Sequence, residues 1–427
     1  MPKEAPAPGY SVALLIIDAL SQQNFVRSLP LTRTYLDQHG GLLYTGYHKV
    51  MIVAQWLQHL AGMQKVSDSI PGLDNNFSSS NRHLSAAKHQ VGHNSFPNTM
   101  ALVRGDTARA MEEAESVSFL DEQGRTFIQT KYGGQGYTTM QLEDLQIYPT
   151  FHRRGKFTLR RPPTDIFFTA PFVAIERERV QNVLLPPEGC YACLQEQLVH
   201  VSELRLIQDF LSMYRATPTM MYAHLSEYSH NNVNMAKLYD KDLKNMMQTL
   251  VTNGVLNNTF FLILGDHGFQ RAESPLLTTS QGRVEDSMPA LYLVPPPSLA
   301  RDHPQLARNL AANTARLTSH FDTHQTLRQL LGLAARRPVE QLFRGYEEHG
   351  TSLLEEVGDR TCREAGVPDA YCQCLGGMTQ LPAAEAEVWA AAVLADINKF
   401  LEPFSFCQKL SLWAVKEATV KKVSSTK

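Results

Sequence analysis

Short apolar runs alternate with amphipathic segments from Tyr10 to Leu331, and this alternation constrains the fold more than any other feature of the chain. Runs such as Val12–Ile17 and Phe260–Leu264 are continuous and apolar, which is typical of strands buried on both faces. His200–Arg215 instead carries apolar residues at three- and four-residue spacing, which predicts a helix. Strands that alternate with helices predict an α/β fold, an α/β/α sandwich with a mostly parallel central sheet.

The individual elements follow from the same patterns. The expected strands are Tyr10–Ile17, Arg125–Thr130, Asp165–Thr169, Thr219–Leu225, Phe260–Leu264 and Ala290–Val294. The expected helices are Gln55–Lys65, Ala101–Glu115, His200–Arg215, Asp240–Asn253, Leu306–Leu317 and Thr323–Leu331. The polar stretches Ser21–Gly41 and Ser67–Asn94 are expected to be long loops over one face.

A change of composition near Gly345 divides the chain into two parts. We expect a catalytic-type domain over residues 1–345 and a small cysteine-bearing C-terminal extension over residues 346–427. The extension should contain a helix, Ala384–Phe400, with one apolar stripe, and should pack against the domain. The stripe consists of Val388, Ala391, Leu394 and Ile397.

Charge and hydropathy exclude two classes of protein. The 40 Lys and Arg residues nearly balance the 42 Asp and Glu residues, and no block of five like charges occurs, so the basic face of a nucleic-acid-binding protein is not expected. The longest apolar run, Val388–Ala395, is far shorter than the roughly 20 residues of a membrane-spanning helix. We therefore expect no nucleic-acid partner and no transmembrane segment, and the oligomeric state stays open.

The six cysteines are unevenly spaced, and four of them follow residue 360. A zinc-thiolate site at Cys190 and Cys193 lacks a second pair of matching spacing. Disulfides in an oxidising compartment are favoured over reduced thiols. We predict that Cys362, Cys372, Cys374 and Cys407 pair among themselves in one of three connectivities, and that Cys190 pairs with Cys193 or stays unpaired.

Two further features bear on the compartment. The triplets that begin at Asn76 and Asn257 are glycosylation sequons, which agree with a glycoprotein of the secretory pathway. Residues 1–17 lack the apolar segment of a signal peptide. We expect an extracellular or secretory-lumen protein, which requires a further N-terminal segment that this sequence lacks.

Polar residues follow the expected strands at the positions where parallel sheets bind ligands. Asp18 comes directly after Val12–Ile17, and Asp266 and His267 come directly after Phe260–Leu264. A third group, His224 to His230 with Glu227 between, follows Thr219–Ala223. Carboxylate and imidazole groups ligate divalent ions, and two adjacent ions are a common device for phosphate and sulfate esters.

The segment from Gly92 to Met100 supplies a nucleophile. Ser95 precedes an X-Pro step, and the chain is expected to enter a helix near Ala101, where backbone N–H groups favour an anion. Coordination to a metal would make the hydroxyl of Ser95 a usable alkoxide. Asn98, one turn on, could donate to a phosphoryl oxygen.

The order of these motifs resembles the alkaline phosphatase superfamily, which includes nucleotide pyrophosphatases/phosphodiesterases, sulfatases and lipid-headgroup phosphotransferases. Within it, the chain resembles a large animal family, domain of unknown function 229, common in nematodes and insects. The segments that carry the resemblance are Ile17–Arg27 with Pro30 and Thr32, Val91–Asn98, His224–Asn231, Gly265–Gly268, Leu317–Leu327, Arg360–Arg363 and Tyr371–Cys374.

The resemblance implies an alkaline phosphatase-like fold and a metal-dependent hydrolase or transferase that acts on phosphoesters through Ser95. It implies a first metal site made by Asp18, Ser95, Asp266 and His267, and a second site that includes Glu227 and His230. We expect one or two divalent ions, zinc first, with manganese, magnesium and calcium as alternatives. The expected substrate is a small phosphoester or a lipid or glycan headgroup.

Several departures from the family pattern leave alternatives open. The family tends to have Asp at His93, Arg at Gln22, and Ser or Thr at Ala19. The acid-to-histidine spacing of the pyrophosphatases is four, whereas Glu227 and His230 are three apart. The third histidine of the second metal site has no clear match in this chain. A non-catalytic binding or structural protein of the same fold is therefore an alternative function.

A sulfatase is disfavoured, because Thr99 stands where the formylglycine frame needs Arg. Ser21 is a rival nucleophile because it follows Asp18 closely. His320 and His324 are candidates for the missing histidine, although capping or exposure is the favoured role for both.

Overall fold

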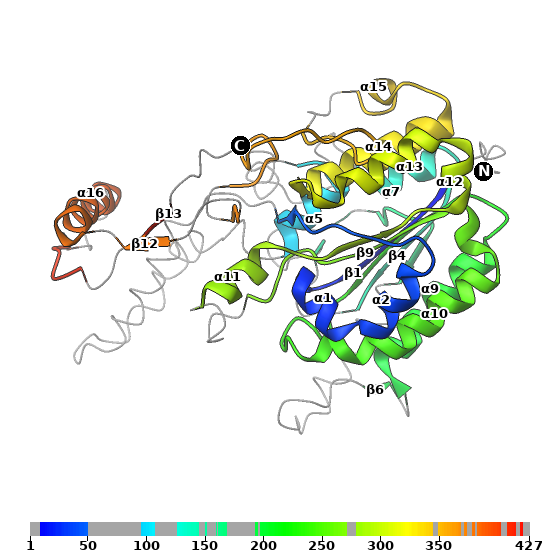
Figure 1. The fold of residues 1–427 in the computed structure, drawn as a ribbon, viewed down its shortest axis with the longest axis horizontal. Helices are drawn as coiled ribbons and strands as arrows, with labels where there is room; N and C mark the ends of the chain where they lie inside the picture. Colours follow the sequence, from blue (N-terminus) through cyan, green and yellow to red (C-terminus); the bar gives the residue numbers. More distant parts are fainter. Residues whose placement is uncertain are drawn as a thin grey trace. The chain divides into compact units, whose positions relative to one another are not determined.

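A seven-stranded sheet runs through the computed structural model in the order β2-β10-β9-β1-β8-β4-β5 (Figure 1). The structure describes residues 9–49, 95–106, 126–144, 150–151, 159, 161–168, 193–194, 197–270, 279–344, 349–368, 371–373, 378–380, 382–402, 408–415 and 419–421. The strands are β1 (Ser11–Ile17), β2 (Leu42–Leu43), β4 (Thr138–Glu143), β5 (Ile166–Phe168), β8 (Thr219–Leu225), β9 (Thr259–Leu264) and β10 (Leu291–Val294).

The sheet is mostly parallel, as the sequence predicts. β1 lies between β8 and β9 and is parallel to both, and β4 and β5 continue in the same direction beyond β8. β10 is antiparallel to β9 and to β2 at the other edge. β1, β8 and β9 are buried along their whole length, which explains why they read as continuous apolar runs.

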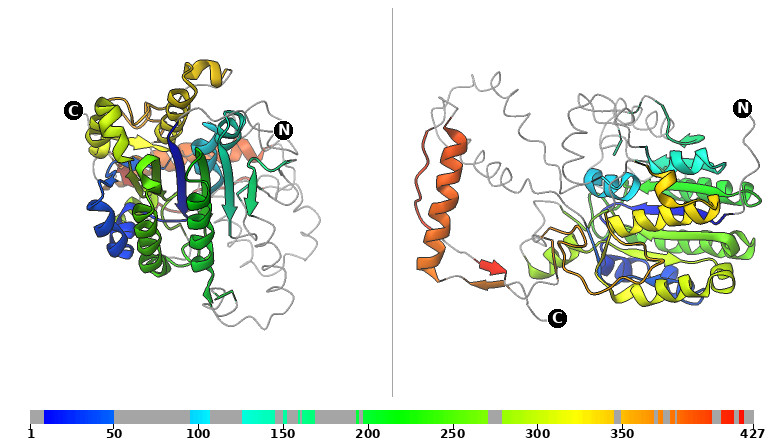
Figure 2. Two further views of the ribbon diagram at one scale, coloured as in Figure 1. Left: turned by 90° about the vertical axis from the view of Figure 1, so that its right-hand side faces the viewer. Right: turned by 90° about the horizontal axis from the view of Figure 1, so that it is seen from above.

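Helices cover both faces of the sheet (Figures 1 and 2). One face carries α2 (Pro30–Asp37), α9 (Val199–Met213) and α10 (Asp240–Thr252), and the other carries α5 (Ser95–Arg104), α7 (Ile128–Gly134) and α14 (His320–Ala335). Leu243 and Met247 of α10 and Leu211 of α9 belong to the same buried cluster as Leu15 and Ile263 of the sheet. The α/β/α sandwich is therefore confirmed.

The remaining elements are short. They are α1 (Gln22–Ser28), α11 (Ser280–Ser287), α12 (Pro297–Asp302), α13 (Pro304–Ala312), α15 (Val339–Leu342), the 3₁₀ turns η3 (Met235–Tyr239), η4 (Val255–Asn258) and η6 (Asn313–Ala315), the parallel pair β3 (Tyr47–His48) with β11 (Thr318–Ser319), and the antiparallel pair β6 (Cys193–Leu194) with β7 (Gln197–Leu198). Within the described part of the chain, no helix combines the length and apolar character needed to cross a membrane.

The chain divides into two compact units, Met1–Tyr371 and Cys372–Lys427. Residues 349–368, which the sequence analysis placed in the extension, thus belong to the first unit. The second unit contains α16 (Ala383–Leu401) and an antiparallel pair of β12 (Met378–Gln380) with β13 (Thr419–Lys421). α16 lies where the sequence predicts a helix, but Val388 of the predicted apolar stripe is exposed. The packing of the extension on the domain stays a prediction.

Cys362 and Cys372 form a disulfide. This confirms one pair among the four C-terminal cysteines. Cys190, Cys374 and Cys407 lie outside the described residues, so their pairing stays a prediction.

Three expected elements are wrong. Arg125–Thr130 is not a strand, because Ile128 and Tyr132 are buried at helical spacing on α7 and the strand comes later as β4. Ser21–Gly41 is not a loop but contains α1 and α2, and the Ser21 side chain caps α1 while Pro30 begins α2. The helix over Leu306–Leu317 ends earlier, at Ala312, where the chain turns toward β11. The segments Gln55–Lys65 and Ser67–Asn94 lie outside the described residues.

Candidate metal centre

The carboxyl ends of β1 and β9 bring Asp18, Asp266 and His267 together. The two strands are parallel neighbours with Ile16 opposite Leu264, so the residues that follow them meet at one edge of the sheet. All three side chains are buried, and their ligand atoms lie within 4.8 Å of one another. The positions of these three residues directly after the strands predict that they share one site.

The hydrogen bonds of Asp266 and His267 orient them toward one point. Asp266 Oδ1 accepts from the backbone N–H groups of Ala19 at 3.1 Å and of His267 at 2.9 Å. His267 Nδ1 lies 2.6 Å from the carbonyl oxygen of Gly268. Because a carbonyl oxygen only accepts, Nδ1 carries the proton and Nε2 keeps a lone pair that faces the carboxylates.

The free atoms of these side chains have the spacing of metal ligands. Asp266 Oδ2 lies 3.4 Å and Asp18 Oδ1 lies 3.7 Å from His267 Nε2. Ligand atoms that are each about 2.1 Å from a tetrahedral ion lie roughly 3.4 Å apart. Asp18 Oδ1 and Asp266 Oδ2 are buried and have no hydrogen-bond partner among the described residues. Such buried orphan atoms are costly unless a ligand satisfies them, so the residues present fit a divalent ion.

Ser95 lies beside this cluster as the first residue of α5. Its Oγ is 3.5 Å from Asp18 Oδ2 and 3.4 Å from His267 Nε2. The helix begins at Ser95 rather than near Ala101, and Pro97 in its first turn is compatible with this start. Asn98 follows on the same helix and is fully buried.

Close backbone packing explains the two glycines of Gly265-Asp266-His267-Gly268. A Cβ at Gly265 would lie 2.1 Å from the carbonyl oxygen of Leu20, and a Cβ at Gly268 would lie 1.9 Å from that of Glu285. Nearby, Ala19 adopts a left-handed conformation with φ of 57°, which an alanine takes at a cost. This conformation accompanies the hydrogen bond from the Ala19 N–H to Asp266.

Burial and neighbouring charges separate the pKa values of the two carboxyl groups. Burial, together with the charge of Asp266, raises the pKa of Asp18 well above its usual value. Burial also opposes the charge of Asp266, but the imidazoles of His267 and His224 outweigh it and lower the pKa of Asp266 to about 2. Asp266 is therefore the carboxylate that stays charged in this pair.

The rival nucleophile Ser21 has a structural role. Its Oγ accepts from the Asn24 N–H at 2.9 Å and so caps α1. The same hydroxyl donates to Glu285 Oε2 at 3.1 Å. These contacts favour the capping role of Ser21 over a nucleophilic one.

Glu227 and His230 do not join the cluster of Asp18, Asp266 and His267 among the described residues. The Glu227 N–H donates to Asp144 Oδ2 at 2.9 Å, and His230 Nδ1 lies 2.8 Å from Asn231 Oδ1. Their role as ligands of a second ion stays a prediction.

His224 begins the third polar group of the sequence, but the resemblance does not assign it to either metal site. It belongs to β8 and is buried, and its Nε2 lies 3.7 Å from Asp266 Oδ2. Burial lowers the pKa of His224 to about 4, so the ring is neutral near pH 7. The signal in the sequence is a histidine near the end of an apolar strand, and the register of β8 against β1 is needed to show that its side chain lies beside Asp266.

His320 and His324 are neither exposed nor caps, contrary to expectation. Both are buried in the first two turns of α14, and the capping box of this helix is made by Ser319 and Asp322. His320 Nε2 lies 3.3 Å from the carbonyl oxygen of Gly265, and His324 Nδ1 lies 2.9 Å from that of Leu102. Burial lowers the pKa of His320 to about 4 and that of His324 to about 3.

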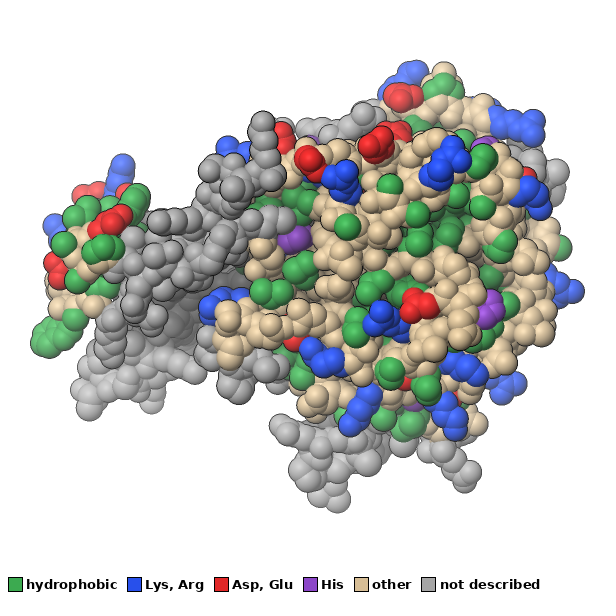
Figure 3. Space-filling model, viewed as in Figure 1, with side chains coloured by type: hydrophobic (Ala, Val, Ile, Leu, Met, Phe, Trp, Pro, Cys, Tyr) green, Lys and Arg blue, Asp and Glu red, His purple; other side chains and the backbone are tan. Residues whose placement is uncertain are grey.

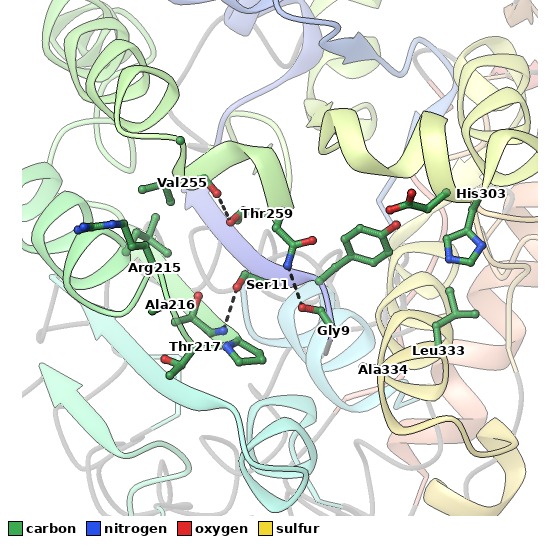
Figure 4. A pocket seen from close by; sticks show the side chains of 17 residues that line it. Gly9, Ser11, Arg215, Ala216, Thr217, Val255, Thr259, His303, Leu333 and Ala334 are labelled. Carbon is green, nitrogen blue, oxygen red and sulfur yellow. Dashed lines mark hydrogen bonds between the residues drawn. The ribbon is translucent and has the colours of Figure 1, made fainter. Parts of the chain in front are cut away.

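A surface cavity lies at the amino ends of the central strands, opposite the carboxyl ends that carry Asp18 and Asp266 (Figure 4). Ser11, Thr219 and Thr259, the first residues of β1, β8 and β9, line it. Ser11 Oγ accepts from the Thr219 N–H at 3.0 Å within its wall. Because these are the amino ends of parallel strands, the cavity is separate from the cluster at their carboxyl ends.

Comparisons with known proteins give one family and several similar folds. A family model described as "Protein of unknown function (DUF229)" matches residues 1–51 and 86–416. None of the curated proteins matches the sequence. A protein in the alkaline phosphatase superfamily from Vibrio parahaemolyticus is 13% identical with a TM-score of 0.45, over 83% of this chain and 72% of that one.

Two further solved structures are similar at the same level. The lipoteichoic acid synthase LtaP from Listeria monocytogenes is 10% identical with a TM-score of 0.44, over 81% of this chain and 75% of that one. The phosphonate monoester hydrolase SpPMH from Silicibacter pomeroyi is 10% identical with a TM-score of 0.44, over 88% of this chain and 80% of that one.

Proposed function

The chain belongs to the DUF229 family of proteins of unknown function, and from the geometry of its candidate metal centre we propose that it is a metal-dependent hydrolase or transferase of phosphoesters. The observation that carries this proposal is the approach of the Ser95 hydroxyl to within 3.5 Å of Asp18 and 3.4 Å of His267. A hydroxyl beside a carboxylate and imidazole cluster is the arrangement of an activated nucleophile.

Asp18, Asp266 and His267 would hold a divalent ion, with Ser95 Oγ as a further ligand. Two carboxylates, an imidazole and a hydroxyl suit zinc, and manganese, magnesium or calcium would require more oxygen ligands. When bound, the ion would lower the pKa of the attached hydroxyl and stabilise negative charge on a phosphoryl group. Glu227 and His230 are proposed for a second ion.

The chemical step on the chain's own residues begins at Ser95. Its Oγ gives up its proton and forms a bond to phosphorus while the bond from phosphorus to the leaving oxygen breaks, and the departing alkoxide takes up a proton. The oxygen of a water molecule then forms a bond to phosphorus while the phosphorus–Oγ bond breaks, and a proton from that water returns to Ser95 Oγ as the phosphate leaves. In a transferase an acceptor hydroxyl takes the place of water. Buried Asn98 is proposed to donate a hydrogen bond to a phosphoryl oxygen during both steps.

The expected substrate is a small phosphoester or a lipid or glycan headgroup. On the face of the first unit that Figure 3 shows, Lys and Arg side chains are interspersed with Asp and Glu rather than gathered in one basic patch. This distribution supports a compact substrate over an extended polyanion.

The function is tested with two substitutions. Ser95→Ala should keep its zinc and lose turnover of p-nitrophenyl phosphate and of bis-p-nitrophenyl phosphate, because the nucleophile is removed while the three ligands Asp18, Asp266 and His267 stay. Asp266→Ala should lose both zinc and turnover. Zinc content is measured by elemental analysis and turnover by nitrophenolate release.

Ser21→Ala is the matched control. It removes a helix cap, which costs about 1 kcal/mol of stability, and should leave turnover intact. Zinc-loaded protein in which Ser95→Ala turns over either ester as fast as the unsubstituted chain would refute the proposed nucleophile. Absence of turnover in every form would favour a non-catalytic binding protein.

A secretory or extracellular location is proposed with this function. The Cys362–Cys372 disulfide supports an oxidising compartment. Asn257, the first residue of one sequon, is exposed on η4, and the sequon at Asn76 lies outside the described residues. Expression through the secretory pathway of cultured cells should give a protein whose mass falls on glycosidase treatment, and Asn257→Gln should remove part of that change.

A further inference from the structure

His224 faces the candidate metal centre from inside the sheet. It is the sixth residue of β8, opposite Ile16 of β1, and the strand direction carries it to the edge where Asp18 follows β1. Its Nε2 is 3.7 Å from Asp266 Oδ2, and neither atom has a hydrogen-bond partner among the described residues. Two buried polar atoms that face each other without partners require an explanation.

The other ring nitrogen of His224 is held by hydroxyl groups. Nδ1 lies 3.2 Å from the hydroxyl of Tyr222 and 3.4 Å from that of Thr150. Both hydroxyls can donate to Nδ1, and in that tautomer the ring proton lies on Nε2. That proton then points toward Asp266 Oδ2.

We propose that His224 is a positioning residue of the metal centre, which donates from Nε2 to Asp266 Oδ2 and so holds this carboxylate for the ion. The inference rests on the proposed function, since it assigns a partner to one of the proposed ligands. A carboxylate oxygen has two lone pairs, so Asp266 Oδ2 can bind an ion and accept this hydrogen bond together. Ligating side chains are commonly oriented by such a second hydrogen bond.

The geometry favours this role over direct ligation. Asp18, Asp266 and His267 place their ligand atoms within 4.8 Å of one another, and His224 does not belong to that set. His224 lies instead on the side of Asp266 that faces β8. The Asp266 carboxylate is thus contacted by Ala19 and His267 through Oδ1 and faced by His224 at Oδ2.

The test measures zinc affinity by calorimetry on chelator-treated protein, together with the melting temperature without zinc. His224→Leu should weaken zinc binding by roughly 10–100-fold, as loss of a supporting hydrogen bond does at other metal sites. His224→Gln should recover most of that affinity, because its amide can donate from nearly the same place as Nε2. The metal-free melting temperature of His224→Leu should fall only modestly, because the substitution removes the unpartnered Nε2 together with the contacts of Nδ1 to the Tyr222 and Thr150 hydroxyls.

His200→Leu is the matched control, because His200 is also buried and contacts a carboxylate, Asp242, at 2.9 Å between α9 and α10. It should lower the melting temperature and leave zinc affinity unchanged. If His224→Leu does not fold, the zinc affinities of His224→Phe and His224→Gln are compared instead.

The outcomes separate this inference from the proposed function. If the unsubstituted protein binds no zinc, or if Asp266→Ala binds it equally well, the metal centre itself is wrong. If zinc binding depends on Asp266 but His224→Leu binds as tightly as the unsubstituted chain, only the role of His224 is wrong. Equal loss of affinity in His224→Leu and His224→Gln would overturn the positioning role in favour of direct ligation.

Discussion

Both oxygens of Asp266 are used at the candidate centre. One of its oxygens accepts two backbone N–H groups, from Ala19 and His267, while the other faces the imidazoles of His267 and His224. The charge of this carboxylate also raises the pKa of Asp18 beside it. The hydrogen bonds and pKa values of these carboxyl groups therefore depend on residues that lie far apart in the sequence.

Glu143 provides a prediction at the same scale. It is buried at the end of β4, where Oε1 accepts from the Thr150 N–H at 3.0 Å, and burial raises its pKa from 4.5 to about 7. A raised carboxyl pKa means that the folded state binds this proton more tightly than the unfolded chain. The free energy of unfolding should therefore fall as the pH rises from 4.5 to 7, by about 3 kcal/mol from this group, and stay level above pH 7.

Glu143→Gln should remove that contribution to the pH dependence, because glutamine does not titrate. Urea unfolding of both proteins without zinc, between pH 4.5 and 8, measures the difference. Parallel curves for the two proteins over this range would show that the pKa of Glu143 is not raised.

At the scale of elements, the turn after β9 determines where the ligands point. Gly265 begins this turn against the carbonyl oxygen of Leu20, in the turn after β1, so the two loops that carry Asp18 and Asp266 touch through their backbones. Ala290 N–H donates to the Leu20 carbonyl oxygen at 2.9 Å, which extends the contact to β10. The ligand geometry depends on this close packing.

Gly265→Ala tests this dependence. Its Cβ would lie 2.1 Å from the Leu20 carbonyl oxygen, so the loops must separate, and we expect a loss of about 1–3 kcal/mol of stability and weaker zinc binding. Gly134→Ala is the control, because nothing lies within 4 Å of its Cβ position at the end of α7, and it should change stability by less than about 0.5 kcal/mol. Equal zinc affinity in both variants would contradict the proposed dependence.

At the scale of the whole molecule, the segment after α15 is anchored to α14. Asp322 accepts from the Thr351 N–H and from Arg360, and the Leu353 N–H donates to Thr326 Oγ1 at 2.8 Å. The Cys362–Cys372 disulfide follows this anchored segment. Its expected contribution is stability rather than chemistry, since neither sulfur belongs to the cluster of Asp18, Asp266 and His267.

Cys362→Ser should therefore lower the free energy of unfolding by about 2–3 kcal/mol, as expected for a disulfide that closes a short loop. Zinc affinity and turnover should be unchanged at 25 °C. Urea unfolding of the variant, and of the unsubstituted chain with and without dithiothreitol, measures the effect. If the variant loses zinc affinity as well as stability, the disulfide also helps to hold the metal ligands in place.

Sequence patterns alone were enough to predict the parallel sheet and three residues of the centre. Buried strands such as β8 and β9 have to be short apolar runs, and the polar residues directly after them have to lie at the carboxyl edge of the sheet. This local relation identified Asp18, Asp266 and His267, which the structure brings within 4.8 Å. The predicted strand Arg125–Thr130 is wrong because so short a segment, with only Phe127 and Ile128 apolar, does not distinguish the spacing of a strand from that of a helix.

The residues that surround this candidate centre cannot be predicted from local sequence patterns. β8 lies beside β1 in the sheet, and this strand order brings His224 close to Asp266. No local sequence pattern encodes the order of the strands. In the same way, burial of His320 and His324 follows from the packing of α14 on α5 and the sheet rather than from the polar character of the residues. Hydrophobic patterning acts within a segment, so the residues that end the strands can be predicted from local sequence. Register and packing act between segments that are far apart in the chain, so which strand ends meet follows only from the folded structure.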